Sequence, residues 1–231
     1  MKISYCTNVK GRLWQLKQTL PENIQKTIAG EIEIVVLDYF SDDGLGEYIK
    51  ETYPEQLADG RLSYYRTTQD RPYDCSHAKN VAHRLGKGTI LFNLDADNYI
   101  GTTVDELSSL DLHEVLLRNR KFTSSKDGTP GRIGLHRSAF YMLNGYDKRF
   151  LGRGCQDGNL MRRAMMHGLR FKYSEDESYP IQNSKSDSLK YCSDGNCVAK
   201  NQKLTFELKV NPDGFGRASL IDVNNQPLEL S

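Results

Sequence analysis

The stretch "GTILFNLDADN" (residues 88–98) decides the fold of this chain, because it is a strand-like apolar run that ends in two aspartates. Side chains two positions apart in an extended chain share a face, so Asp95 and Asp97 converge if the extended conformation persists. Two carboxylates held together repel each other unless a cation lies between them, and hard oxygen ligands favour Mg²⁺ or Mn²⁺. The pattern therefore indicates either a divalent metal site or a plain turn at the end of a strand.

On both sides of this stretch, short apolar strands alternate with amphipathic helices. We expect strands at residues 2–6, 32–38, 62–66 and 88–95, and helices at residues 11–28, 41–51 and 74–86. Strand and helix alternating in this way predict an α/β fold, in which helices cover both faces of a parallel sheet. Ligands bind such sheets beyond the carboxyl ends of the strands, where Asp38 and Asp95 lie.

Composition excludes several classes of protein. With 31 basic and 30 acidic residues the formal net charge is +1, which gives no electrostatic case for a nucleic-acid partner. The sequence contains no signal peptide and no apolar run long enough for a membrane span, although peripheral membrane association stays open. An odd number of scattered cysteines, five, favours a reducing compartment and hence a soluble, cytoplasmic protein.

Cys192 and Cys197 form the only close cysteine pair in the sequence. Their spacing suits either a stapled turn or half of a zinc site. No second Cys/His pair with ligand spacing accompanies them, so we expect free thiols.

The strand and helix pattern stops near residue 185, so we divide the chain into a main domain (1–185) and an appendage (186–231). The polar residues 184–202 read as a loop. Three later stretches alternate like strands, namely "KLTFELKV" (203–210), "GRASLID" (216–222) and "PLEL" (227–230). They predict a small antiparallel meander packed on the main domain, with contact to an acceptor or to a second protein domain left open.

Four stretches, in this order, carry a resemblance to a known family. They are "CTNVKGRLWQLKQTL" (6–20), "EIVVLDYFSDDG" (33–44), "CSHAKNVAHRLGKGTILFNLDADN" (75–98) and "GRIGLHRSAFYMLNGYDKRFLGRGCQDGNLMRRA" (131–164). Together they resemble the nucleotide-sugar-dependent glycosyltransferases of the GT-A fold, in particular the family-two group and relatives with a galactosyltransferase-type C-terminal half. The resemblance implies a Rossmann-like, mixed but mostly parallel sheet flanked by helices over residues 1–185.

The resemblance also implies a donor site. Thr7, Asn8 and Asp38 would line the base and ribose pocket, with Asp38 accepting a hydrogen bond from a pyrimidine ring N–H. Lys79 would approach the diphosphate; the plain alternative is a solvated lysine on an exposed helix face. Asp43 also matches a family aspartate, but capping a helix is the role that we favour for it.

Metal and acceptor roles follow from the same resemblance. Asp97 would be the principal ligand of Mn²⁺ or Mg²⁺, and Asp95 would contact the metal or the ribose. Asp157 stands where inverting relatives keep their general base, and Gln156 would contact the acceptor. Arg153 would contact the acceptor or the diphosphate; the plain alternative is a surface arginine in a glycine-rich loop. The structural alternative for Asp157 is the N-cap of the helix that follows.

The sequence departs from the family pattern at two places. Gln156 stands before Asp157 where relatives commonly have Glu, and Asn183 stands near the place where many relatives bring a late histidine to the metal. The resemblance implies a glycosyltransferase, of hexosyltransferase type and suited to polysaccharide biosynthesis. It would move a sugar from a nucleoside diphosphate sugar, more often a UDP-sugar, to a glycan or glycoconjugate acceptor with inversion. A sugar-nucleotide nucleotidyltransferase and a non-catalytic nucleotide- or sugar-binding module are the alternatives.

Overall fold

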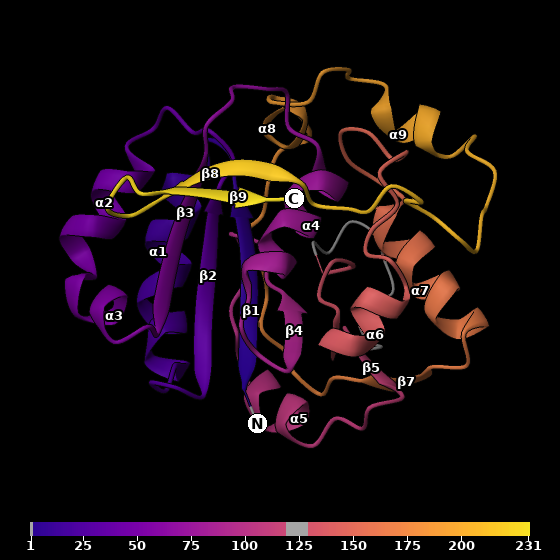
Figure 1. The fold of residues 1–231 in the computed structure, drawn as a ribbon, viewed down its shortest axis with the longest axis horizontal. Coiled ribbons are helices and arrows are strands. Elements are labelled where there is room, and N and C mark those ends of the chain that lie inside the picture. Colours follow the sequence, from indigo (N-terminus) through magenta and orange to yellow (C-terminus); the bar gives the residue numbers. More distant parts are fainter. Residues whose placement is uncertain (1, 119–128) are drawn as a thin grey trace.

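The strand that precedes Asp95 lies next to the central strand of a mixed sheet (Figure 1). The computed structural model describes residues 2–118 and 129–231, and the elements below refer to those ranges. The strands are β1 Ile3–Val9, β2 Ile32–Asp38, β3 Leu62–Thr67, β4 Ile90–Asn93, β5 Glu114–Leu117, β6 Gly134–His136, β7 Arg170–Tyr173, β8 Ala218–Asp222 and β9 Pro227–Leu230. The helices are α1 Leu13–Asn23, α2 Leu45–Thr52, α3 Pro54–Ala58, α4 Cys75–Leu85, α5 Thr103–Ser108, α6 Arg137–Met142, α7 Gln156–Met166, α8 Lys185–Leu189 and α9 Cys197–Asn201, with a 3₁₀ turn η1 at Ile24–Lys26.

Within these ranges the strand order is β7-β5-β6-β4-β1-β2-β3-β8-β9. The four inner strands β4, β1, β2 and β3 are parallel, and antiparallel β6 joins them to β5, which runs parallel to β7. The parallel register sets Val9 beside Asp38 and Cys6 beside Asn93, so β1, β2 and β4 all end at one edge of the sheet. This edge carries the acidic residues that the sequence singled out.

Strand β2 shows why the sheet has a core on each face. All seven of its residues are buried, as expected for a strand covered on both sides. Ile34 and Val36 pack into the apolar cluster that includes α1 and α2, whereas Val35 and Leu37 pack into the cluster that includes α4, α6 and α7. The period of two along an extended chain produces this alternation.

One helix cap is as the sequence predicted, and two predictions about helix starts need correction. The Asp74 side chain accepts a hydrogen bond from the His77 N–H and caps α4, as expected. Helix α2 begins at Leu45 instead of residue 41, because the Ser41 N–H donates to Asp38 and closes a turn there. The capping role expected of Asp43 belongs to a different helix, since its Oδ2 accepts from the Leu13 N–H at the start of α1 (2.8 Å).

The tail differs from the expected separate meander. Residues 216–222 and 227–230 do contain strands, β8 and β9, but residues 203–210 do not form one. The β8–β9 hairpin extends the main sheet, because β8 pairs antiparallel with β3 (Figure 1, yellow). The hairpin covers the backbone groups that the edge of β3 would otherwise leave unpaired. The division of the chain at residue 185 stays a prediction.

Residues 184–202 are not a plain loop either, since α8 and α9 lie within them. Ser184 caps α8 by accepting from the Asp187 N–H (3.0 Å), which a polar Ser-x-x-Asp sequence permits. In the described ranges, every helix is too short or too polar to cross a lipid bilayer.

Candidate active site

Asp95 and Asp97 lie in a turn that directly follows β4, so the strand does not persist through them. The Asn98 N–H donates to the Asp95 carbonyl (2.9 Å) and closes this turn. Burial and then the charge of Asp95 raise the pKa of Asp97 to about 6, the direction expected for a carboxyl group with a like charge nearby. The turn that the sequence offered as one alternative is therefore present, and the metal site stays a prediction.

Asn183 lies beside Asp97, as its position in the sequence predicted. Its Nδ2 donates to Asp97 Oδ2, while its Oδ1 accepts from Gln15 Nε2 (2.6 Å) and from Arg12. Because two donors occupy the amide oxygen, the NH₂ group of Asn183 faces the carboxylate. Asn183 thus orients Asp97 and does not offer its oxygen to a cation.

Lys79 projects from α4 into the middle of the cluster. Its Nζ lies 2.7 Å from Asp157 Oδ1 and 3.9 Å from Asp95 Oδ1, and it stands over the ring of Tyr146. Burial by itself lowers the pKa of Lys79, but Asp157 and Asp95 together raise it well above its usual value. With a side chain only 2 % exposed, Lys79 is not the solvated surface lysine of the plain alternative.

Asp157 is not the N-cap of α7, which corrects the structural alternative. Cys155 takes that position in a left-handed conformation (φ 71°), and Asp157 lies inside the first turn with its carboxylate on Lys79. Gln156 Nε2 donates to Asp157 Oδ2 (3.2 Å) and to Cys75 Sγ (3.3 Å). Burial raises the pKa of Asp157, and Lys79 opposes that shift.

The acceptor-side residues Gln156 and Arg153 have different surroundings. Gln156 Oε1 is buried and has no hydrogen-bond partner among the described residues. Arg153 is half-buried in the glycine-rich loop before α7, close enough that its charge lowers the pKa of Asp157. Their contact with an acceptor stays a prediction.

The predicted base pocket lies at the ends of β1 and β2. The buried Asp38 carboxylate accepts from the Ser41 N–H (2.6 Å), Tyr64 Oη (2.7 Å) and Arg66 Nη1 (2.8 Å). The sequence analysis did not single out Arg66. Its signal was a basic residue near the end of a predicted strand, and in the structure it lies opposite Asp38 in the register of β2 and β3. The contact between Asp38 and a pyrimidine base stays a prediction. The base N–H would be a fourth donor to a carboxylate that already accepts three hydrogen bonds.

Thr7 and Asn8 are buried near the end of β1, the strand that pairs with β2. Asn8 Oδ1 accepts a hydrogen bond from Tyr73, whereas Asn8 Nδ2 is buried without a partner among the described residues. A free amide donor at the edge of the sheet suits recognition of a ligand oxygen. The donor-binding roles of Thr7 and Asn8 stay predictions.

Gly131 closes the cluster and was not recognised from the sequence. A Cβ at this position would lie 2.7 Å from Asp95 Oδ2 and 3.0 Å from Lys79 Nζ. Asn93 Nδ2 holds both neighbours by donating to Asp95 Oδ1 (3.0 Å) and to the Gly131 carbonyl (2.9 Å). The backbone of Gly131 therefore approaches the two charged groups more closely than any residue with a side chain could.

The donor set suits a hard divalent cation with few protein ligands. In residues 2–118 and 129–231, no group of three or more His, Cys, Asp or Glu side chains is arranged to hold a metal ion. Asp97 and Asp95 remain as a carboxylate pair whose repulsion a cation would relieve. Mg²⁺ and Mn²⁺ accept such sites, because water and ligand oxygens complete their coordination.

A parallel sheet with polar side chains gathered beyond β1, β2 and β4 defines a Rossmann-like α/β protein with its site at the carboxyl edge. No protein-family model matches the sequence, and no curated protein is similar to it. Its structure is nevertheless similar to solved glycosyltransferases, and the chain has the GT-A fold, as predicted.

Three solved structures illustrate the similarity. S. aureus TarS 1-349 is 17 % identical, with a TM-score of 0.63 over 81 % of this chain and 62 % of that one. The mannosyltransferase PcManGT from Pyrobaculum calidifontis, solved with GDP-Man and Mn²⁺, is 20 % identical, with a TM-score of 0.59 over 75 % of this chain and 54 % of that one. The catalytic domain of Drosophila β1,4-galactosyltransferase 7, solved with xylobiose, is 14 % identical, with a TM-score of 0.62 over 99 % of this chain and 91 % of that one. This chain therefore spans about three fifths of the TarS 1-349 structure and nearly all of the Drosophila domain.

Proposed function

We propose that the protein is a metal-dependent glycosyltransferase that moves a hexosyl group from a UDP-sugar to a hydroxyl of a glycan acceptor, with inversion. The observation that carries this proposal is the buried Lys79–Asp157 pair beside Asp95 and Asp97, at the ligand-binding edge of a GT-A sheet. Related folds support the donor class, since TarS was solved with UDP and with UDP-GlcNAc. A mutant of the Drosophila enzyme was solved with manganese, UDP-Gal and xylobiose.

Asp97 and Asp95 are the residues that would hold the cation. Asn183 fixes the Asp97 carboxylate through its NH₂ group, and Asn93 fixes Asp95, so both oxygens are oriented before a ligand arrives. A bound Mn²⁺ or Mg²⁺ supplies charge stabilisation for the diphosphate oxygens as the leaving group departs.

Asp157 is the proposed general base. A sugar hydroxyl is a poor nucleophile, so a carboxylate that accepts its proton during attack lowers the barrier. Burial raises the pKa of Asp157 and so makes it a better proton acceptor, while Lys79 keeps it ionised and oriented. Gln156 orients the second oxygen of the same carboxylate, and its unpartnered Oε1 can accept a hydrogen bond from the acceptor. In an inverting transfer the activated hydroxyl attacks the anomeric carbon on the face opposite the departing diphosphate.

The first loop argues against a nucleotidyltransferase. That class cradles a triphosphate in a glycine-rich first loop, whereas this loop contains only Gly11. The Tyr191 side chain packs on that glycine, with its Oη 2.1 Å from where a Cβ would stand. The space beside this glycine is therefore already filled by a tyrosine from the tail.

A thermal-shift screen of UDP, GDP, CDP and their sugars, each with and without Mn²⁺, tests the proposal. A specific donor raises the melting temperature by mass action, and the rise for a UDP-sugar should require Mn²⁺. The donor so identified is then assayed for UDP release with a panel of glycan acceptors. Pyrophosphate release from a triphosphate would identify a nucleotidyltransferase instead, and binding without turnover would identify a binding module.

A further inference from the structure

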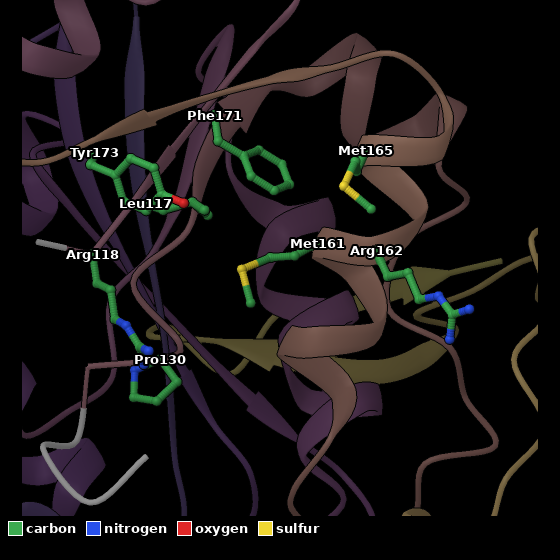
Figure 2. Close-up of a pocket in the computed structure, with 8 residues that line it drawn as sticks. All are labelled: Leu117, Arg118, Pro130, Met161, Arg162, Met165, Phe171 and Tyr173. Atoms are coloured by element: carbon green, nitrogen blue, oxygen red, sulfur yellow. The ribbon is translucent and has the colours of Figure 1, made fainter. Parts of the chain in front are cut away.

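A pocket of about 350 Å³ opens between α7 and the ends of β5 and β7 (Figure 2). Ligand pockets in proteins are roughly 300–1,000 Å³ and mostly apolar. This one fits that description, because its lining consists largely of carbon and sulfur: Leu117, Pro130, Met161, Met165, Phe171 and Tyr173. Figure 2 shows Met165 beside the Phe171 ring and Met161 extending from the helix into the pocket, whereas Arg162 points away from it.

Two features connect this pocket with the candidate active site. Asp157, Met161 and Met165 follow each other at intervals of four along α7, so they form one stripe on the helix. With a rise of about 1.5 Å per residue, Met161 lies roughly 6 Å along the helix from the proposed base. Pro130 lines the pocket, and its neighbour Gly131 lies against Asp95 and Lys79. The pocket therefore lies about one helical turn along α7 from the proposed base, within reach of a molecule whose hydroxyl lies at Asp157.

The chemistry of the walls defines what would extend there. Met165 is 58 % exposed and Tyr173 is 37 % exposed, so the walls present apolar surface that a ligand could cover. Arg118 follows the end of β5, and its side chain extends toward Pro130, the neighbour of Gly131 (Figure 2). A guanidinium at the entrance and an apolar interior fit an anion followed by an alkyl or aryl group.

We propose that this pocket is an acceptor subsite for an apolar aglycone that is joined to the reacting sugar through an anionic group, with Arg118 contacting the anion. The inference rests on the proposed transfer to an acceptor hydroxyl at Asp157, and it names the class of acceptor: an amphiphilic, anionic glycoconjugate. Met161 and Met165 are the residues that select the aglycone.

NMR of protein labelled with ¹³C at the methionine methyl groups tests the subsite directly, with octyl phosphate as the probe. We expect octyl phosphate to shift the Met161 and Met165 signals and to leave Met142 and Met166 unchanged. The latter two are 51 % and 55 % exposed and line no part of the pocket, so they report nonspecific detergent binding. Octyl glucoside below its micelle concentration should bind more weakly, and inorganic phosphate at the same concentration should cause no shift at the methionines.

Variants separate the two parts of the subsite. Arg118→Gln should weaken octyl phosphate binding at least threefold and leave octyl glucoside binding unchanged, whereas Met165→Gln should weaken both. Met166→Gln is the matched control, because it makes the same change at the next, equally exposed position and should alter neither affinity. Equal shifts at all four methionines, or no shift at Met161 and Met165, would overturn the proposal.

The same titration in the presence of UDP and Mn²⁺ separates this inference from the proposed function. A subsite for the acceptor must bind octyl phosphate while the donor product is bound, so the affinity should be unchanged. Competition between the two would assign the pocket to the donor and overturn the inference. Octyl phosphate binding without any UDP binding would leave the pocket intact as a ligand site but refute the glycosyltransferase proposal on which its acceptor role rests.

Discussion

Lys79 Nζ and Asp157 Oδ1 lie 2.7 Å apart in a buried ion pair that joins α4 to α7 across 78 positions of sequence. The pair connects the proposed donor side, through Asp95, with the proposed acceptor side, through Gln156. Burial removes water from both charged groups. The attraction between them offsets this lost hydration, so removing either partner leaves an uncompensated buried charge. The arrangement fixes the proposed base, Asp157, near Asp95, one of the two carboxylates that would hold the metal.

Asp157→Asn should therefore affect both stability and catalysis. It leaves Lys79 buried with only the more distant Asp95, so we expect a loss of about 3 kcal/mol in the free energy of unfolding. Sugar transfer should fall on the order of 10²-fold or more, because an amide cannot accept the proton. Urea unfolding and initial rates of UDP release measure the two effects.

The double variant Lys79→Met, Asp157→Asn separates the effect on stability from the effect on catalysis. Removing both charges should restore the free energy of unfolding to within about 1 kcal/mol of the parent, since no buried charge then remains unpaired. Transfer should stay as low as in Asp157→Asn. Near-normal transfer by Asp157→Asn would mean that the base is a different residue.

Asp97→Ala should abolish the Mn²⁺-dependent part of UDP binding and leave the fold of the metal-free protein intact. Asp97 lies in a turn beyond β4, where its side chain contributes little to the core, and burial and the charge of Asp95 raise its pKa. Calorimetric titration of UDP at several Mn²⁺ concentrations measures the effect. A variant that kept the Mn²⁺ dependence of the parent would exclude Asp97 as a ligand.

Gly131→Ala should weaken donor binding at least tenfold, because its Cβ would displace the Asp95 carboxylate and Lys79. Gly158→Ala is the matched control. A Cβ at Gly158 meets nothing within 4 Å, and alanine within α7 should raise stability by roughly 0.5–1 kcal/mol. Thermal shift with UDP and Mn²⁺ compares the two variants, and equal donor binding by both would show that the close approach at Gly131 is not needed.

His83 should make the protein sensitive to acid. Its ring is buried against Phe140, and burial lowers its pKa from the ordinary 6.5 to about 3. A histidine with a depressed pKa contributes stability that is complete above about pH 6.5 and is lost as the pH falls toward 3, because the unfolded chain takes up the proton first.

Between pH 6.5 and pH 5 this loss amounts to about 2 kcal/mol at 1.36 kcal/mol per pH unit. His83→Phe should remove that part of the pH dependence, whatever its effect on absolute stability. Urea unfolding of both proteins at pH 7.5 and pH 5.0 measures the difference in slope. Parallel pH dependences would show that the pKa of His83 is not lowered by folding.

The sequence by itself determined the elements whose signals are local. All seven residues 32–38 form β2 because a continuous apolar run suits a strand covered on both faces. Helix α4 begins at Cys75 with Asp74 as its N-cap, within one residue of the predicted start, since a cap needs only the next three residues. The carboxylates after β4 were also recognisable, because the end of a strand and its acidic turn lie within one short stretch.

Tertiary structure alone decided the contacts that make these elements a site. The pairs Lys79–Asp157, Asp97–Asn183 and Asp38–Arg66 join side chains 78, 86 and 28 positions apart. No local pattern specifies such pairs, because they depend on which strands are neighbours and on how helices pack over the sheet. The β8–β9 hairpin joins β3 for the same reason, since an edge strand accepts a partner from anywhere in the chain. Local propensity can therefore identify a strand, a cap or an acidic turn, whereas the charge environment of each catalytic group arises only when distant segments exclude water together.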